Sequence, residues 1–316
     1  MKNVGRAILA LLAAALVGGV AEDGGPSRRV VTRDGWRVIE ADFHVHTRLS
    51  DGFLSPFEVV LHARRNGLDA LAITEHNVTH PAWMARWFSR MIGGPTILVG
   101  EEVTTDRFHL IAIGLRERVS PYGDLGAIID DVHRKGGVAI AAHPVARFWP
   151  AFDAVLDKLD GAELMHPLAL GPRDRARRGW RWEEMRDFHL RATKRGYPLT
   201  PVGSSDYHFF QGLGVTRTLV LARDDSAEAI LDAVRAGRTV VRDRDGNLHG
   251  NARAIAILTE RPIAPAEQVE SAGDRGYHPK GVVDHASRIA GWLGMLGVVA
   301  FPLARRRRGP PAEGSA

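Results

Sequence analysis

The chain of 316 residues contains no cysteine. This absence excludes disulfide bonds, thiolate metal sites, iron–sulfur clusters and cysteine nucleophiles. The sequence also lacks a G-x-G-x-x-G or Walker-type phosphate loop and a G-x-S-x-G segment that would present a serine nucleophile. Any metal site must therefore be built from His, Asp and Glu, and covalent acyl catalysis has no visible nucleophile.

The net charge of +5 and the pI near 9.9 raise the question of an anionic partner. Lys2 and Arg6 give residues 1–21 a charge of +2, and four arginines less Glu313 give residues 304–316 a charge of +3. The body of the chain, residues 22–303, is therefore neutral. The basic balance belongs to the two ends and gives no strong signal for nucleic-acid binding.

The first 21 residues have the pattern of an export signal. Two basic residues precede 15 uncharged ones from Ala7 to Ala21, and Gly19-Val20-Ala21 offers a small-residue cleavage site. We expect residues 1–21 to be a signal peptide or an N-terminal anchor. The alternative is a buried N-terminal helix of the domain.

The C-terminal end predicts a second membrane-directed segment. Residues 289–304 are uncharged and are followed by Arg305 to Arg308. An apolar run stopped by arginines favours a transmembrane or anchor helix at 286–304, with the basic tail 305–316 cytoplasmic. Alternatives are an amphipathic surface helix or a processed sorting tail. Residues 259–285 are expected to be a linker, and the protein is expected to be exported, periplasmic or extracytoplasmic, and membrane-anchored.

Between residues 36 and 258, short β-rich runs alternate with helical patterns. This alternation predicts β/α units around a parallel sheet, either open or closed into a barrel. Ser55, Pro56 and Glu58 form a capping-box pattern at the start of the first of these helices. The expected strands are 38–42, 70–74, 96–100, 109–115, 138–142, 162–165, 199–204, 218–222 and 239–242, and the expected helices are 56–66, 81–92, 123–135, 151–159, 182–195 and 226–236.

Almost every expected strand ends in a His, Asp or Glu. His44 and His46 are two residues apart on an extended segment, so their side chains can share one metal ion; Asp206 and His208 repeat this spacing. In a β/α barrel, such strand ends meet at one mouth. Imidazoles and carboxylates without thiolates suit Zn, Mn or Fe.

The order of these segments resembles the polymerase and histidinol phosphatase (PHP) superfamily. The chain has D-F-H-V-H-T at 42–47, T-E-H at 74–76, G-E-E at 100–102, a lone His109, A-H-P at 142–144 and G-S-S-D-Y-H at 203–208. The resemblance implies an α/β fold, a distorted (β/α)7 TIM-like barrel, with two or three divalent ions at its mouth. The T-E-H-N form at 74–77 resembles exported members related to carbaryl hydrolase.

Carried over by motif, the resemblance implies three ion positions. Glu102 would bridge the first two ions, and Glu101 is its rival. Asp42 would orient a histidine, and His208 or Asp51 could carry a proton if the third ion is missing. The first ion would be held by His44, His46, Glu102 and Asp206, the second by Glu102, His109 and His143, and the third by Asp51, His76 and His208.

The resemblance predicts a metallohydrolase that uses a metal-bound hydroxide, with a phosphoester as the foremost substrate class. Arg147, four residues after His143, is a candidate for binding an anionic substrate group, and a surface arginine is the alternative. A carboxyl- or carbamate-ester hydrolase is the second hypothesis. A PHP-like domain that binds metal without turnover is the third. Trp83 and Trp87 recur at helical spacing and are expected in the core.

Overall fold

The computed structural model describes residues 2–23, 30–165, 181–208, 212–259 and 282–307. The chain divides into two compact units. One unit consists of residues 27–276, and the other combines residues 1–26 with residues 277–316. The predicted linker 259–285 and the basic tail 305–316 fall largely outside the described residues.

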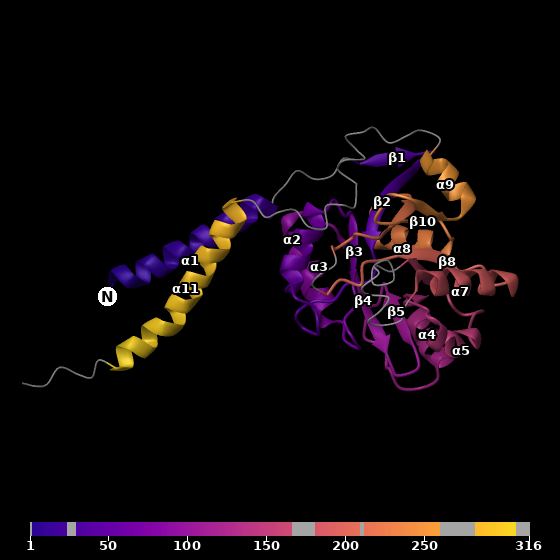
Figure 1. The fold of residues 1–316 in the computed structure, drawn as a ribbon, viewed down its shortest axis with the longest axis horizontal. Coiled ribbons are helices and arrows are strands. Elements are labelled where there is room, and N and C mark those ends of the chain that lie inside the picture. Colours follow the sequence, from indigo (N-terminus) through magenta and orange to yellow (C-terminus); the bar gives the residue numbers. More distant parts are fainter. Residues whose placement is uncertain (1, 24–29, 166–180, 209–211, 260–281, 308–316) are drawn as a thin grey trace, which may run out of the picture. The chain divides into compact units, whose positions relative to one another are not determined.

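A single mixed sheet organises the larger unit (Figure 1). Its strands run in the order β11-β10-β9-β2-β3-β4-β5-β6-β7-β8, and β1 pairs with β2. Four neighbouring pairs are parallel, namely β2–β3, β3–β4, β6–β7 and β7–β8, and the others are antiparallel. The bounds are β1 Val31–Arg33, β2 Trp36–Asp42, β3 Ala70–Ile73, β4 Thr96–Thr104, β5 His109–Ile113, β6 Val138–Ala141, β7 Gly161–Met165, β8 Thr200–Gly203, β9 Arg217–Ala222, β10 Thr239–Arg242 and β11 Leu248–Gly250.

Threonine hydroxyls of β9 and β10, which lie near one end of the sheet, make hydrogen bonds to β8 at the other end. The hydroxyl of Thr218 in β9 accepts from the amide of Gly203 in β8 at 3.0 Å and lies 2.8 Å from its carbonyl oxygen. Thr239 in β10 donates to the carbonyl of Pro201 at 2.7 Å. Pro201 has no N–H to give to a strand ladder, which fits its place on an edge strand. The predicted α/β barrel is therefore present as a nearly closed, mixed sheet.

Helices flank the strands. Figure 1 shows α2 and α3 on one side of them and α4, α5 and α7 on the other. The capping box is confirmed, because Ser55 Oγ accepts from the Glu58 amide and the Glu58 carboxylate accepts from the Ser55 amide. The bounds are α2 Pro56–Arg65, α3 His80–Ile92, α4 Leu125–Arg134, η1 Ala146–Phe148, α5 Trp149–Asp153, α7 Trp182–Lys194, α8 Ala227–Arg235 and α9 Ala252–Thr259.

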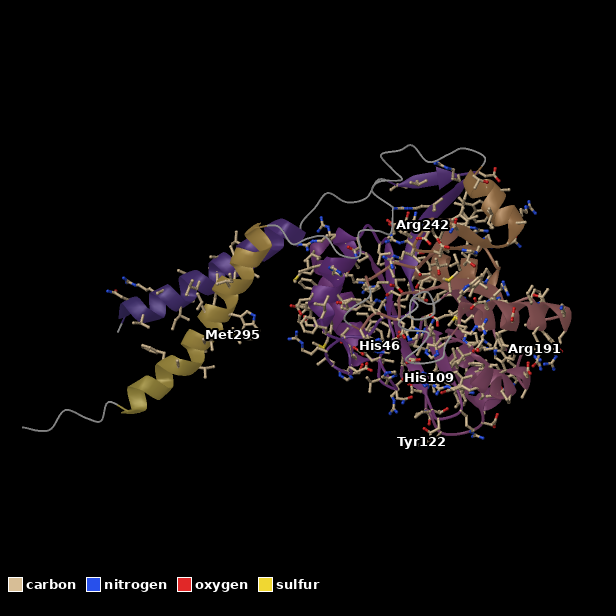
Figure 2. The ribbon with its side chains drawn as sticks, viewed as in Figure 1. His46, His109, Tyr122, Arg191, Arg242 and Met295 are labelled. Atoms are coloured by element: carbon tan, nitrogen blue, oxygen red, sulfur yellow. The ribbon has the colours of Figure 1, made fainter. Side chains whose placement is uncertain are left out.

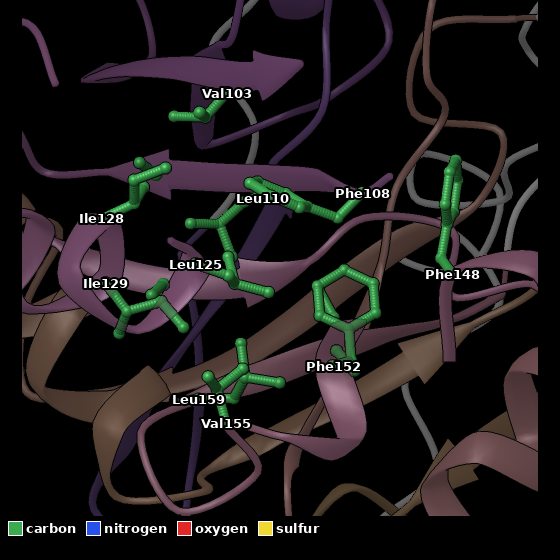
Figure 3. Packing of buried hydrophobic residues seen from close by; sticks show 14 of the residues in the cluster. Val103, Phe108, Leu110, Leu125, Ile128, Ile129, Phe148, Phe152, Val155 and Leu159 are labelled. Atoms are coloured by element: carbon green, nitrogen blue, oxygen red, sulfur yellow. The ribbon is translucent and has the colours of Figure 1, made fainter. Parts of the chain in front are cut away.

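The core of the larger unit lies between the sheet and these helices. One cluster joins Leu110 of β5 to Ile128 and Ile129 of α4 and to Phe148 and Phe152 (Figure 3). A second cluster takes alternate residues from most of the strands and packs them against α8. Because every second strand residue faces the same side, Glu102 of β4 shares a face with Leu98, and His109 of β5 shares a face with Ile111 and Ile113 of this cluster.

Each terminal segment forms a helix, α1 Lys2–Asp23 and α11 Val282–Arg307. Gly294 of α11 lies against Leu12, and Gly297 lies against Ile8, so the two helices pack antiparallel. In the described parts of the chain, no helix combines the length and the apolar character needed to cross a membrane. This finding corrects the prediction of a transmembrane, membrane-anchoring helix at 286–304. Export through residues 1–21 stays a prediction.

Candidate metal centre

The predicted ligands lie in or directly after six strands of the sheet and meet in one place. His44 and His46 follow β2, His76 follows β3, His143 follows β6, and Asp206 and His208 follow β8. Glu102 lies within β4, and His109 opens β5. Bridges between Val45 and Tyr207 and between His76 and Glu102 hold these segments side by side. His46 is buried, and Figure 2 labels it and His109 in this unit.

Four of the ligand residues converge at the buried end of the centre. Nε2 of His44 lies 3.1 Å from Nε2 of His46, and each of these atoms lies 3.2 Å from Oδ1 of Asp206. The carboxylate of Glu102 is 3.6 Å from His44 and 3.7 Å from His46. Ligands at about 2.0–2.2 Å from a tetrahedral ion are separated by about 3.3–3.6 Å. The donor set and its spacing fit one divalent ion.

Glu102 extends the centre to a second group. Its Oε1 lies 2.8 Å from Nδ1 of His109 and 3.2 Å from Nε2 of His143. The neighbouring Glu101 does not join this group: it accepts from the amide of Val119, and burial raises its pKa to about 7. Adjacent residues of a strand face opposite sides, so Glu102 is the carboxylate placed between the two groups.

A more exposed group lies beside the first. Oδ2 of Asp51 is 3.3 Å from Nε2 of His76 and 3.2 Å from Nε2 of His208. The side chain of Asp51 is 52% exposed, which leaves this group open to solvent. His46 Nδ1 lies 3.6 Å from Oδ1 of Asp51. The structure thus adds His46 to the predicted set of Asp51, His76 and His208.

The charges of the centre are strongly coupled. Burial alone would lower the pKa of His44, but Asp206, Glu163 and Glu102 raise it well above its usual value. Burial would raise the pKa of Glu102, but His44, His109 and His143 hold it well below its usual range. The imidazole and carboxylate groups thus favour each other's charged forms. A divalent cation can replace the imidazole protons, as metal binding to histidine requires.

The backbone is strained at this centre. Of the non-glycine residues with positive φ in the described chain, three lie here, with φ of 57° at Asn77, 26° at His143 and 45° at Asp206. Residues other than glycine rarely adopt this backbone conformation, and it persists where surrounding contacts enforce it. It turns His143 and Asp206 out of the direction of their strands and toward the other ligands.

Asp42 and Glu75 support the ligands in different ways. Asp42 is fully buried, and its carboxylate accepts from the amides of His44, Ser205 and Gly214. These contacts hold the backbone of the loops that carry the ligands, and the role of Asp42 in orienting a histidine stays a prediction. Glu75 accepts from Thr47 and Ser50 and lies 3.8 Å from Nδ1 of His46.

Arg147, the predicted anion-binding residue, is placed by stacking. Its guanidinium carbon lies 4.3 Å from the centroid of the Phe148 ring. Phe148 in turn stacks on His109, with ring centroids 5.2 Å apart. A guanidinium therefore lies one aromatic ring away from a candidate ligand. Stacking on an aromatic face is a common way to hold an arginine in one orientation.

Glu163 is a participant that the sequence interpretation missed. It lies in β7, is fully buried and contacts both His44 and His143. The available signal was its position: a carboxylate in an otherwise apolar strand of a sheet whose other strands end in ligands. The motif order alone gave no reason to select it.

Comparisons with known proteins agree with this geometry. Residues 191–239 match the family described as PHP-associated. An uncharacterised protein of Methanocaldococcus jannaschii is 26% identical over 141 residues, which cover 40% of this chain and 82% of that protein.

Among solved structures, the chain resembles a two-domain protein of Bacteroides vulgatus described as containing a predicted PHP-like metal-dependent phosphoesterase. The TM-score is 0.61 at 22% identity, over 74% of this chain and 73% of that one, which shows a shared fold. The predicted relation to carbaryl hydrolase stays a prediction. The matched PHP-associated segment and the shared fold agree with the resemblance to the PHP superfamily that the order of the motifs predicts.

Proposed function

We propose that the protein is a phosphoesterase that acts on small-molecule phosphoesters with two or three divalent ions. The observation that carries the proposal is Glu102, whose single carboxylate lies between two groups of histidines. A shared carboxylate suits adjacent cations, the arrangement used for displacement at phosphorus. His44, His46, Glu102 and Asp206 would hold one ion, Glu102, His109 and His143 the next, and Asp51, His76 and His208 a third.

The bound ions would supply an activated water molecule and would neutralise oxygens of the ester. The chain's own residues do the rest of the work. Arg147, held on Phe148 beside His109, pairs with an anionic oxygen of the substrate. With only two ions bound, Asp51 and His208 form a hydrogen-bonded, solvent-accessible pair that can pass a proton to the leaving group. The buried histidines and carboxylates keep their positions throughout the reaction.

Hydrolysis of a carboxyl or carbamate ester is the second candidate, and one observation favours it. Leu49 and Phe53, on either side of Asp51 in the sequence, are 46% and 56% exposed. The amide of Phe53 donates to the carbonyl of His208 at 2.8 Å, so this loop is docked beside the outer histidines. Two exposed apolar side chains here would suit a neutral or aromatic substrate group.

A substrate screen of the metal-loaded protein separates these candidates. Aryl phosphates and phosphodiesters are compared with aryl carboxyl esters and carbamates, and the His44→Ala variant serves as the control. Turnover of phosphoesters alone supports the proposal. Turnover of esters or carbamates alone replaces it with the second candidate. Stoichiometric metal binding with no turnover of any class favours a metal-binding module without catalysis.

A further inference from the structure

Glu163 joins two parts of the centre that the fold brings from different strands. Oε1 of Glu163 lies 3.1 Å from Nδ1 of His44, and Oε2 accepts from the backbone amide of His143 at 2.6 Å. All three residues are buried, with exposures of 0%, 0% and 2%. One carboxylate thus contacts a candidate ligand of the first ion and the backbone of a candidate ligand of the second.

The contact with His44 fixes which ring nitrogen faces the centre. A carboxylate can only accept hydrogen bonds, so Nδ1 of His44 carries a proton toward Glu163. The lone pair of Nε2 then points toward His46 and Asp206, the direction in which an ion would lie. Metal-bound histidines commonly have such a carboxylate on the nitrogen away from the metal.

The contact with His143 acts on the backbone. His143 has a φ of 26°, a conformation that L-residues rarely adopt. Its amide hydrogen bond to Glu163 is short, at 2.6 Å, and lies in a fully buried environment. A charge-assisted hydrogen bond of this kind offsets part of the cost of such a conformation. Through it, Glu163 helps to direct the ring of His143 toward Glu102.

We infer that Glu163 is a positioning residue that sets the ring orientation of His44 and the backbone of His143, and so controls how tightly the centre binds divalent ions. The inference rests on the proposed metal centre, but it concerns a residue outside the predicted ligand set. It predicts that the two acceptor oxygens of Glu163 matter for ion binding, in addition to the space that the side chain fills in the core.

The Glu163→Gln substitution tests this with almost no change in shape. A glutamine side chain has one acceptor oxygen and one donor NH2 group, whereas His44 Nδ1–H and the His143 amide both need acceptors. An NH2 group toward His44 would favour the tautomer whose proton points at the ion. An NH2 group toward His143 would place two donors face to face.

The measurement is the binding of Co²⁺, followed by isothermal titration and by the visible absorption of the bound ion. We expect Glu163→Gln to bind at least one ion about 10–100-fold more weakly, with altered absorption. The matched control is Glu101→Gln, the same change to a buried carboxylate that faces away from the ligands, and it should bind like the wild type. Wild-type affinity and absorption in Glu163→Gln would overturn the inference. Absence of Co²⁺ binding in the wild type would overturn the metal centre as well.

A second measurement keeps the inference testable if Glu163→Gln does not fold. Nitrogen-15 NMR of the histidine rings in the zinc-loaded wild type reports which nitrogen of His44 is protonated. We expect the proton on Nδ1 and the ion on Nε2. The reverse assignment would show that Glu163 does not set the orientation of His44.

Discussion

Nε2 of His44 and Nε2 of His46 lie 3.1 Å apart in a fully buried position. Two imidazole nitrogens at this distance are stable when one donates to the other or when a cation lies between them. Asp206 lies 3.2 Å from both, so the arrangement also supplies a negative charge to such a cation. Nδ1 of His46 makes no hydrogen bond in the described structure, although it is buried. These features together favour metal coordination over a simple histidine hydrogen bond.

Because Glu102 lies between two groups of histidines, its substitution should weaken the binding of two ions, whereas substitution of His109 should weaken the binding of one. We expect Glu102→Gln to lose about two equivalents of bound metal and His109→Ala about one, because the Glu102 carboxylate lies between the two groups and His109 belongs to one of them. Loss of several kcal/mol of charge stabilisation corresponds to a fall in kcat of about 10²–10³-fold or more. Elemental analysis of the purified variants, together with steady-state kinetics, measures both effects.

Glu101→Gln is the control for this pair, since Glu101 faces Val119 and the opposite side of β4. It should keep the metal content and activity of the wild type. Equal metal loss in Glu102→Gln and His109→Ala would argue against a bridging carboxylate.

Arg147 should act on substrate charge. We expect Arg147→Ala to raise KM for phosphoesters with a smaller effect on kcat, since the guanidinium pairs with an anionic group. Hydrogen bonds to charged groups contribute about 1.5–3 kcal/mol, so kcat/KM should fall about 10–100-fold. Neutral ester substrates should show no such fall.

Arg186 offers a matched control, because it stacks on Trp182 of α7 much as Arg147 stacks on Phe148. Arg186→Ala should leave the kinetics unchanged. If both variants lose activity equally, the loss comes from the missing arginine–aromatic stacking, and a role of Arg147 in substrate binding is contradicted.

A buried ion network should stabilise the fold without serving the reaction. Glu40 lies 2.6 Å from Arg217 and 2.7 Å from Arg242, and all three side chains are buried. Removing one partner of such a network leaves uncompensated buried charge and costs about 3–5 kcal/mol. We expect Glu40→Gln to lower the free energy of unfolding by this amount in denaturant titrations. Its metal content per folded molecule should be that of the wild type, and a selective loss of metal would contradict this assignment.

Much of the fold could be predicted from the sequence because apolar runs and turn residues repeat regularly. The expected strand 239–242 matches β10, and the expected helix 182–195 matches α7 within one residue. The antiparallel pairing of β5, β9 and β10 could not be foreseen, since a local sequence pattern does not show which strand a given strand will pair with. The short strands β1 and β11 lack a distinctive pattern and were missed.

The candidate site was predictable as a set of ligand types, and its supporting contacts were not. Trp83 and Trp87 show the limit of helical spacing: we expected them in the core, but they are 42% and 62% exposed. Periodicity shows that residues share a face of a helix without showing which face is covered. Similarly, the sequence placed Asp42 near His44 but could not show that its carboxylate binds three backbone amides.

A histidine outside the metal centre predicts how stability depends on pH. Burial lowers the pKa of His189 to about 4, and its Nε2 lies 2.9 Å from the carbonyl oxygen of Ala162, so the neutral ring donates to this carbonyl. The unfolded chain, with a histidine pKa near 6.5, binds a proton first as the pH falls. This contribution to stability is therefore complete above about pH 6.5 and is lost as the pH falls toward 4.

We expect the metal-free wild type to lose about 2 kcal/mol more than His189→Gln between pH 7.5 and pH 4.5, after allowance for the partial exposure of the ring. Glutamine keeps an N–H donor for Ala162 but does not titrate in this range. Urea titrations in the presence of chelator at both pH values give the difference, and chelator removes the contribution of bound ions. Identical pH dependence in the two proteins would show that His189 is protonated as readily in the folded chain as in the unfolded one.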